Sequence, residues 1–180
     1  MFVAVWPPEE VNEGLAALAK PELEWLRWTA PHQWHITMSF LGEVDEEAAR
    51  AVFSCISPPA GVVAEMGPHA GWFGHRVLQL PVSGLEDLSA VVRARLGSGA
   101  DHDRDFNGHI TLARVRRNRE RPRRLADVSS AVQLTATWPV LELTLVRSGL
   151  SRTGAHHEVV DALDIPLGGD ESVSATAKGG

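Results

Sequence analysis

The chain has 180 residues, of which 44% are hydrophobic, and it carries a formal net charge of -6. That length allows one domain with a sizeable core, and the net negative charge excludes nucleic-acid binding through overall charge. The single cysteine, Cys55, excludes an internal disulfide and a cysteine-based zinc site. No apolar run approaches the roughly 20 residues that cross a bilayer, and the first residues lack the basic region of a signal peptide. We therefore expect a soluble, cytoplasmic enzyme or binding domain without a membrane segment.

The first 42 residues are predicted to form a strand, a helix and a second strand. The apolar residues 2–6 indicate a strand that enters the core. A helix should follow, because Pro8 suits a first turn, two glutamates complement its positive end and apolar residues recur at helical spacing. Residues 27–31 are expected only to connect this helix to a strand over 35–42.

A second helix and two strands are predicted next. Asp45 can cap the helix that follows Gly42. The inward face of this helix is expected to comprise Ala48, Val52, Phe53 and Ile56. Strands over 62–66 and 76–81 should then be joined by a loop over 67–74.

The second half repeats the alternation of helices and strands. A helix is predicted over 83–96, and strands over 109–114, 138–147 and 156–163. Seven arginines fall between residues 114 and 124, which makes this the local basic patch of an acidic chain. The patch either contacts an RNA backbone or is a solvated loop.

Two segments of the chain are near copies of one another. The sequence HITMSFLG begins at His35 and HITLAR begins at His109, so the histidines stand 74 positions apart (109 minus 35). This repeat predicts a single bilobal domain over residues 1–167, with one β-α-β-type unit in each half. The small, polar and Gly-rich residues 168–180 are expected to form a disordered tail.

Each copy indicates a half-buried strand, because apolar and polar residues alternate. Residues two apart on a strand share a face, so His35, Thr37 and Ser39 are expected to face a polar region. The opposite face, expected to point into the core, comprises Ile36, Met38 and Phe40. Stacking against a nucleobase is the alternative for Phe40.

Two imidazoles on facing strands suit one kind of chemistry. In-line displacement at phosphorus needs a base on the attacking oxygen and an acid on the leaving oxygen, and histidine can serve as either near neutral pH. The hydroxyls of Thr37 and Thr111 lie on the same faces as His35 and His109, where they can donate hydrogen bonds to phosphate oxygens. Such a site requires no metal and no cofactor.

The paired motifs resemble the 2H phosphoesterase superfamily, and specifically its RNA 2′,3′-cyclic phosphodiesterase (2′-5′ RNA ligase-like) branch. The resemblance rests on both His-x-Thr strands, with Phe-Leu-Gly after the first and Leu-Ala-Arg after the second. It extends to Phe2–Val5, Arg27-Trp28, Gly71–Phe73 and Leu143–Ser148. It implies an α+β, bilobal fold in which two antiparallel sheets, related by pseudo-two-fold symmetry, surround a central cleft with helices on the outside.

The resemblance also implies an activity, namely hydrolysis of RNA or nucleotide 2′,3′-cyclic phosphates to 2′-phosphomonoesters by a monomer acting on RNA ends. His109 would be the proton acceptor that activates water, and His35 the proton donor to the departing 3′-oxygen. Arg114 matches a position that can contact the phosphate, although strict alternation would place it opposite His109. The other candidate substrate contacts are Ser39, Phe40 and the loop residue Phe73, which alternatively closes the core.

The sequence departs from the family pattern near its C-terminal end. Family members often carry a tyrosine there, and this chain has no tyrosine. Ser148-Gly149-Leu150, Gly154 and His156-His157 occupy the region instead. Taken singly, the histidines outside the two motifs, His157 among them, are interpreted as structural.

Three alternatives remain open. Within the class, the substrate could be a 2′-5′ phosphodiester, or the reaction could be the joining of RNA ends. Outside it, the histidines could hold a metal in a metallohydrolase, although neither histidine strand carries a carboxylate on the same face. The chain could also be a nucleotide- or RNA-binding module without turnover.

Overall fold

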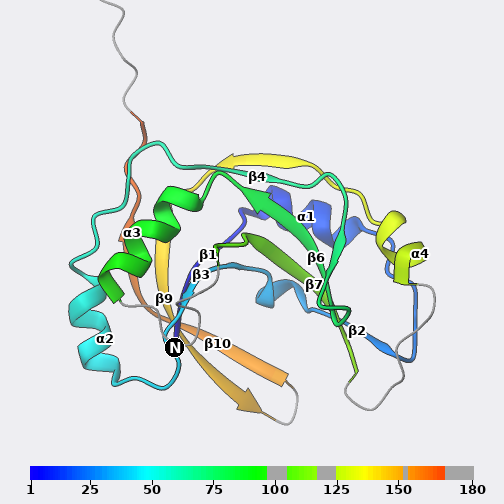
Figure 1. Ribbon diagram of the computed structural model, residues 1–180, viewed down its shortest axis with the longest axis horizontal. Coiled ribbons are helices and arrows are strands. Elements are labelled where there is room, and N and C mark those ends of the chain that lie inside the picture. The colour runs from blue at the N-terminus through cyan, green and yellow to red at the C-terminus, as the bar shows by residue number, and fades with distance from the viewer. Residues whose placement is uncertain (97–104, 117–124, 152–153, 169–180) are drawn as a thin grey trace, which may run out of the picture.

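The computed structural model describes residues 1–96, 105–116, 125–151 and 154–168, which form two antiparallel sheets flanked by helices (Figure 1). The first sheet has the strand order β10-β9-β1-β3, formed by Gly154–Asp164, Glu142–Ser151, Phe2–Val5 and Ile36–Phe40. The second has the order β2-β7-β6-β4-β8, formed by Leu26–Trp28, His109–Val115, Val77–Ser83, Val63–Met66 and Ala136–Pro139. A further strand, β5 (Gly71–Phe73), pairs with β6. The predicted α+β fold with two antiparallel sheets is confirmed.

Helices lie on the outside of the sheets (Figure 1). They are α1 (Glu9–Ala17), α2 (Glu46–Phe53), α3 (Glu86–Leu96) and α4 (Leu125–Ser130), with a 3-10 turn at Pro31–Gln33. Within the described part of the chain, none of them is long and apolar enough to cross a membrane. In the chain, α1 lies between β1 and β3 of the first sheet, and α3 lies between β6 and β7 of the second.

The start of α2 agrees with the sequence, but its predicted inward face is correct only at Phe53 and at Ile56, which follows the helix and is buried. The Asp45 side chain accepts a hydrogen bond from the Ala48 amide at 2.9 Å and caps the helix. Ala49 and Phe53 are buried, whereas Ala48 and Val52 are exposed. Positions four apart form one stripe, and only the stripe through Phe53 packs on the core.

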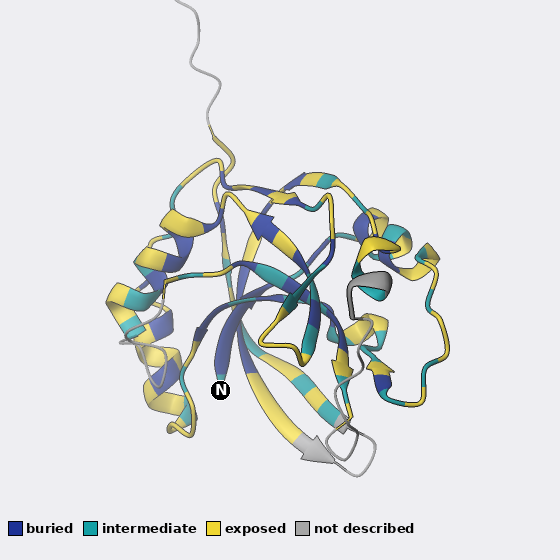
Figure 2. Cartoon of the chain, turned by 45° about the vertical axis from the view of Figure 1, so that its right-hand side comes forward, coloured by how far each residue is buried: buried dark blue, intermediate teal, exposed yellow. Residues whose placement is uncertain are grey.

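One hydrophobic core connects the two sheets. It includes Val3 and Ile36 from the first sheet and Leu80 and Ile110 from the second, each with no exposed surface. Figure 2 shows the buried residues concentrated in the central strands and the exposed ones on the helices and connections. Buried residues of both sheets thus belong to one continuous cluster.

Two segments that sequence analysis treated as connections are short strands. The segment after α1 contains β2, which pairs with β7, and the expected loop over 67–74 contains β5, which pairs with β6. Strands of three residues have no pattern long enough to recognise, and their hydrogen-bond partners come from distant sequence.

The single strand expected over 138–147 is two strands in different sheets. β8 pairs with β4 in the second sheet, whereas β9 pairs with β1 and β10 in the first. The chain crosses between the sheets at Val140 and Leu141, and the Val140 amide donates to the Val62 carbonyl. The tail beyond residue 168 and the arginines at 117–124 lie outside the described residues.

Candidate active site

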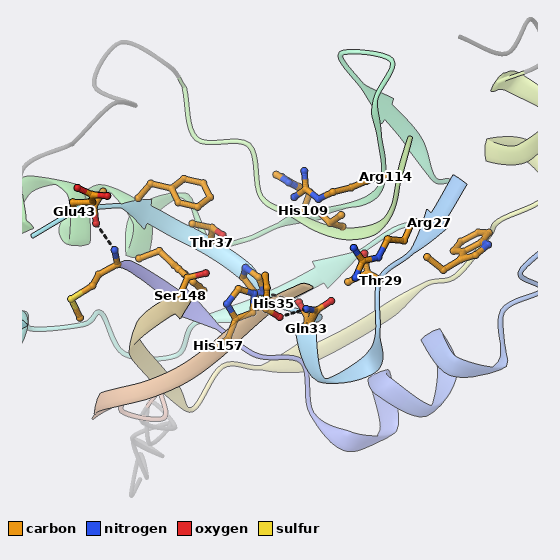
Figure 3. A pocket seen from close by; sticks show the side chains of 17 residues that line it. Arg27, Thr29, Gln33, His35, Thr37, Glu43, His109, Arg114, Ser148 and His157 are labelled. Carbon is orange, nitrogen blue, oxygen red and sulfur yellow. Dashed lines mark hydrogen bonds between the residues drawn. The ribbon is translucent and has the colours of Figure 1, made fainter. Parts of the chain in front are cut away.

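A cleft of about 690 Å³ is lined by both histidine motifs (Figure 3). His35 immediately precedes β3 of the first sheet, and His109 is the first residue of β7 in the second; the strands β3 and β7 contact each other. Other elements complete the walls. The additional lining residues used below are Met1, Arg27, Thr29, Gln33, Glu43, Ser148 and His157.

A β-bulge interrupts the first motif. Thr37 pairs with Ala4 and Ser39 pairs with Val3, so Met38 is an extra residue in β3. The bulge reverses the alternation beyond this point. Ser39 is only 5% exposed, whereas Phe40 is 49% exposed and lines the cleft. The expectation that Phe40 faces the core is therefore wrong, and so is the expectation that Ser39 faces the polar side.

The second motif contains the same bulge at the equivalent position. In the β6-β7 pair, Thr111 lies opposite Gln79 and Ala113 opposite Leu78, which leaves Leu112 as the extra residue. Arg114 consequently points into the cleft with His109 and Thr111, rather than to the opposite face. Each motif thus contributes three side chains to one cleft, and the two sets are related by the repeat.

In each bulge, the carbonyl group of the extra residue accepts a hydrogen bond from another element. The buried Ser89 hydroxyl of α3 donates to the Met38 carbonyl at 3.1 Å. The Thr29 amide donates to the Leu112 carbonyl at 2.8 Å. Because an unpaired buried carbonyl is costly, these contacts stabilise the distortion that redirects Phe40 and Arg114.

The two imidazoles are oriented in the same way. Nδ1 of His35 lies 2.7 Å from the Gln33 carbonyl oxygen, and Nδ1 of His109 lies 2.8 Å from the Asn107 carbonyl oxygen. A carbonyl oxygen only accepts, so Nδ1 carries the proton in each ring. Nε2 is therefore the nitrogen that gains or loses a proton at each histidine.

Burial keeps these imidazoles neutral. It lowers the pKa of His35 to about 4, against the opposing effect of the Gln33 hydrogen bond. Electrostatic repulsion from His157 and His109 in their protonated forms, and from Arg114, lowers this pKa further. The pKa of His109 is also lowered, mainly by burial. At pH 7 the ligand-free cleft therefore presents two Nε2 lone pairs.

Aromatic rings account for the burial of His35. The Phe2 ring stacks on it at 4.9 Å between centroids, and the Trp6 ring lies at 5.4 Å. The Trp6 indole donates to the Thr144 hydroxyl, which in turn donates to the Ala4 carbonyl. This chain of hydrogen bonds fixes the apolar side of the His35 pocket.

Phe73 reaches the site indirectly. Its ring stacks on His109 at 6.2 Å, with 12° between the ring planes. Phe73 belongs to β5 and is not among the residues that line the cleft. It restricts the orientation of the His109 ring, and the substrate contact anticipated for it stays a prediction.

Three polar groups in the cleft are available to a ligand. Within the described residues, the hydroxyls of Thr37 and Thr111 and the guanidinium of Arg114 form no hydrogen bond or ion pair. All three side chains line the cleft beside the histidines. Hydroxyl and guanidinium donors of this kind suit the oxygens of a phosphate.

His157 is a site residue that sequence analysis missed. It lies on β10 opposite Ser148 of β9, and its ring meets that of His35 edge-on at 5.1 Å. Burial lowers its pKa, and its buried Nδ1 has no hydrogen-bond partner. The sequence signal is its position, which falls where the family pattern has a tyrosine, although a lone histidine on a strand is usually structural.

No group of three or more His, Cys, Asp or Glu side chains in the described residues could hold a metal ion. His35 and His157 are adjacent, but the carboxylate in the cleft wall, Glu43, lies toward the opposite end from Arg27 (Figure 3). The groups that do line the cleft are suited to proton transfer and anion binding.

Comparison with known proteins identifies relatives of this chain. Residues 5–59, which include the first motif, match the model of the LigT-like phosphoesterase family. The chain is 30% identical over 184 residues to an RNA 2′,3′-cyclic phosphodiesterase of Thermus thermophilus, covering 92% of this chain and 89% of the relative.

Solved structures show the same fold. The crystal structure of TT0787 of Thermus thermophilus has a TM-score of 0.75 at 28% identity, covering 92% of this chain and 97% of that one. The structure of E. coli LigT complexed with 3′-AMP has a TM-score of 0.70 at 26% identity, covering 91% and 96%. Sequence and fold thus agree along the chain, which belongs to the LigT-like phosphoesterase family.

Proposed function

We propose that this protein hydrolyses 2′,3′-cyclic phosphates at RNA ends or on nucleotides, giving 2′-phosphomonoesters without a metal ion. The observation that carries the proposal is the matched pair of bulged strands, which brings His35, Thr37, His109, Thr111 and Arg114 into one cleft. The relative named as an RNA 2′,3′-cyclic phosphodiesterase supports the substrate class.

The reaction divides between the two imidazoles. Nε2 of His109 takes a proton from water as the water oxygen attacks phosphorus, and the bond from phosphorus to the 3′-oxygen breaks. Nε2 of His35 gives a proton to that 3′-oxygen, so the product keeps its phosphate on the 2′-oxygen. Thr37, Thr111 and Arg114 donate hydrogen bonds to the non-bridging oxygens, where negative charge accumulates.

The negative charge of the substrate affects the protonation of His35. In the ligand-free cleft, burial makes His35 a poor proton carrier at pH 7. A bound phosphodiester anion favours the protonated imidazole and raises its pKa. The proton that His35 donates is therefore taken up together with the substrate.

The test is hydrolysis of a nucleoside 2′,3′-cyclic phosphate in excess chelator, with identification of the product isomer. His35→Asn and His109→Asn are suitable variants, because the asparagine amide can still donate at the position of Nδ1 while Nε2 is lost. His156→Asn is the control, since His156 is exposed and does not line the cleft. Both site variants should lose on the order of 10²-fold or more in rate.

The outcomes separate the alternatives. A 2′-phosphate product, lost in both site variants and kept in the control, supports the proposal. Hydrolysis only of 2′-5′-linked oligonucleotides, or joining of RNA ends, would replace the substrate but retain the site. Activity that requires a divalent metal would overturn the mechanism, and binding without turnover of any of these substrates would indicate a binding module.

A further inference from the structure

One imidazole in the cleft has no part in the reaction described above. His157 of β10 lines the cleft next to His35 (Figure 3). Its ring centroid lies 5.1 Å from that of His35 and 5.2 Å from that of Phe2, and the Phe2 and His35 centroids are 4.9 Å apart. The three centroids thus form a nearly equilateral triangle. His157 therefore stands beside the stacked pair rather than over the far face of His35, where it would be much farther from Phe2.

The two nitrogens of the His157 ring have different surroundings. Nδ1 is buried and has no hydrogen-bond partner. Nε2 is not buried in this way, and within the described residues it also forms no hydrogen bond. Because the side chain lines the cleft, Nε2 is the nitrogen that a bound ligand can reach.

Packing alone does not account for an imidazole at this position. A buried polar atom without a partner, such as Nδ1 of His157, lowers the stability of the folded state. A phenyl ring could pack against Phe2 and His35 in the same way without an unpaired nitrogen. What the imidazole adds to such a ring is Nε2, and its place in the cleft indicates a role toward a ligand.

The two motifs supply unequal sets of donors to the cleft. Beyond its histidine and threonine, the second motif contributes Arg114, whereas the first contributes Phe40 at the equivalent position after the bulge. A phenyl ring has no N–H or O–H group to donate to a phosphate oxygen. The His35 side of the cleft therefore lacks a third donor from its own strand, and His157 is placed beside His35 to supply one.

A donor on this side must be compatible with the role of His35. His35 has to carry a proton when the 3′-oxygen departs, and a positive charge on His157 lowers the His35 pKa. Burial lowers the pKa of His157 itself, so this ring is neutral at pH 7. A neutral imidazole has one N–H, and with that proton on Nε2 it can donate to a phosphate oxygen without opposing the protonation of His35.

We propose that His157 is a third catalytic imidazole, whose Nε2–H donates a hydrogen bond to a non-bridging phosphate oxygen on the side of His35. The proposal rests on the proposed function and adds one residue to its site. His157 keeps its proton throughout, and the acid and the base remain His35 and His109. Its hydrogen bond strengthens as negative charge accumulates on the phosphate oxygen.

Three substitutions separate this role from packing. A glutamine amide can donate near the position of Nε2, an asparagine amide can donate near that of Nδ1, and phenylalanine keeps a ring without a donor. His157→Gln should therefore keep most of kcat/KM for adenosine 2′,3′-cyclic phosphate. His157→Asn and His157→Phe should each lose on the order of 10- to 100-fold, the size of one hydrogen bond to a charged group.

Two controls accompany these variants. Urea unfolding should show His157→Phe to be at least as stable as the intact protein, because the unpaired Nδ1 is removed. His156→Phe is the matched substitution on the same strand, and it should leave kcat/KM unchanged, since His156 is exposed and does not line the cleft.

A purely structural role predicts the opposite order of activities. Full activity in His157→Phe, or equal losses in His157→Gln and His157→Phe, would overturn the donor role and leave the proposed function intact. A comparable loss in His156→Phe would trace the effect to a disturbance of β10 and also overturn the donor role.

A binding measurement keeps the donor role testable without turnover. If the intact protein does not hydrolyse the cyclic phosphate, the proposed function fails, and the affinity for adenosine 2′-phosphate then decides the role of His157. Affinity kept in His157→Gln and weakened in His157→Phe would support the hydrogen bond to phosphate. Equal affinity in these two variants, or no binding by the intact protein, would overturn it.

Discussion

The burial of His35 makes a quantitative prediction about acid stability. In the folded protein burial lowers the pKa of this imidazole to about 4, whereas an exposed histidine in the unfolded chain titrates near 6.5. As the pH falls below 6.5, His35 becomes protonated in the unfolded chain but stays neutral in the folded protein. Stability is therefore full above pH 6.5 and is lost progressively down to about pH 4.

The magnitude follows from the size of the shift. At about 1.4 kcal/mol per pKa unit, His35 alone removes about 3 kcal/mol of unfolding free energy across the full window. About 2 kcal/mol of this is lost between pH 7 and pH 5. That is a large fraction of the stability of an ordinary domain.

Urea unfolding at pH 7 and pH 5 measures this loss. The intact protein should lose about 2 kcal/mol more between the two pH values than His35→Asn does, whatever the variant costs at pH 7. His156→Asn, at an exposed position, should follow the intact protein. If His35→Asn loses as much as the intact protein, the His35 imidazole is accessible to protons in the folded state and the burial argument is refuted.

Three further predictions concern catalysis and the strands that support it. Because burial lowers the pKa of both His35 and His109, kcat/KM should be bell-shaped with its optimum below pH 6.5; an optimum in the alkaline range would contradict this. Ser89→Ala should lower the unfolding free energy by about 1–3 kcal/mol and reduce kcat, since it leaves the carbonyl of the β3 bulge unpaired; unchanged urea unfolding and unchanged turnover would exclude that role. Phe40→Ala should raise KM for a nucleoside cyclic phosphate about 10-fold with little change in stability, and an unaltered KM would argue against base stacking.

The sequence alone determined the elements with long, regular patterns. The helix that begins after Pro8 and the one that buries Leu88 and Val92 were predictable from apolar residues at helical spacing. The repeat of His-x-Thr predicted the facing strands and the candidate imidazoles, because residues two apart on a strand share a face. These inferences depend only on local geometry, which the order of residues fixes.

Tertiary structure decided everything that depends on a partner strand. A bulge is defined by the register of two strands, so no pattern within HITMSF or HITLAR could show that Phe40 and Arg114 turn into the cleft while Ser39 is buried. Contacts between distant segments likewise placed His157 against His35 and set Arg27 opposite Arg114. The sequence thus determined which residues could transfer a proton. The pairing of strands far apart in the chain decided which side chains lie beside those residues. It could do so because register and packing are properties of two segments together.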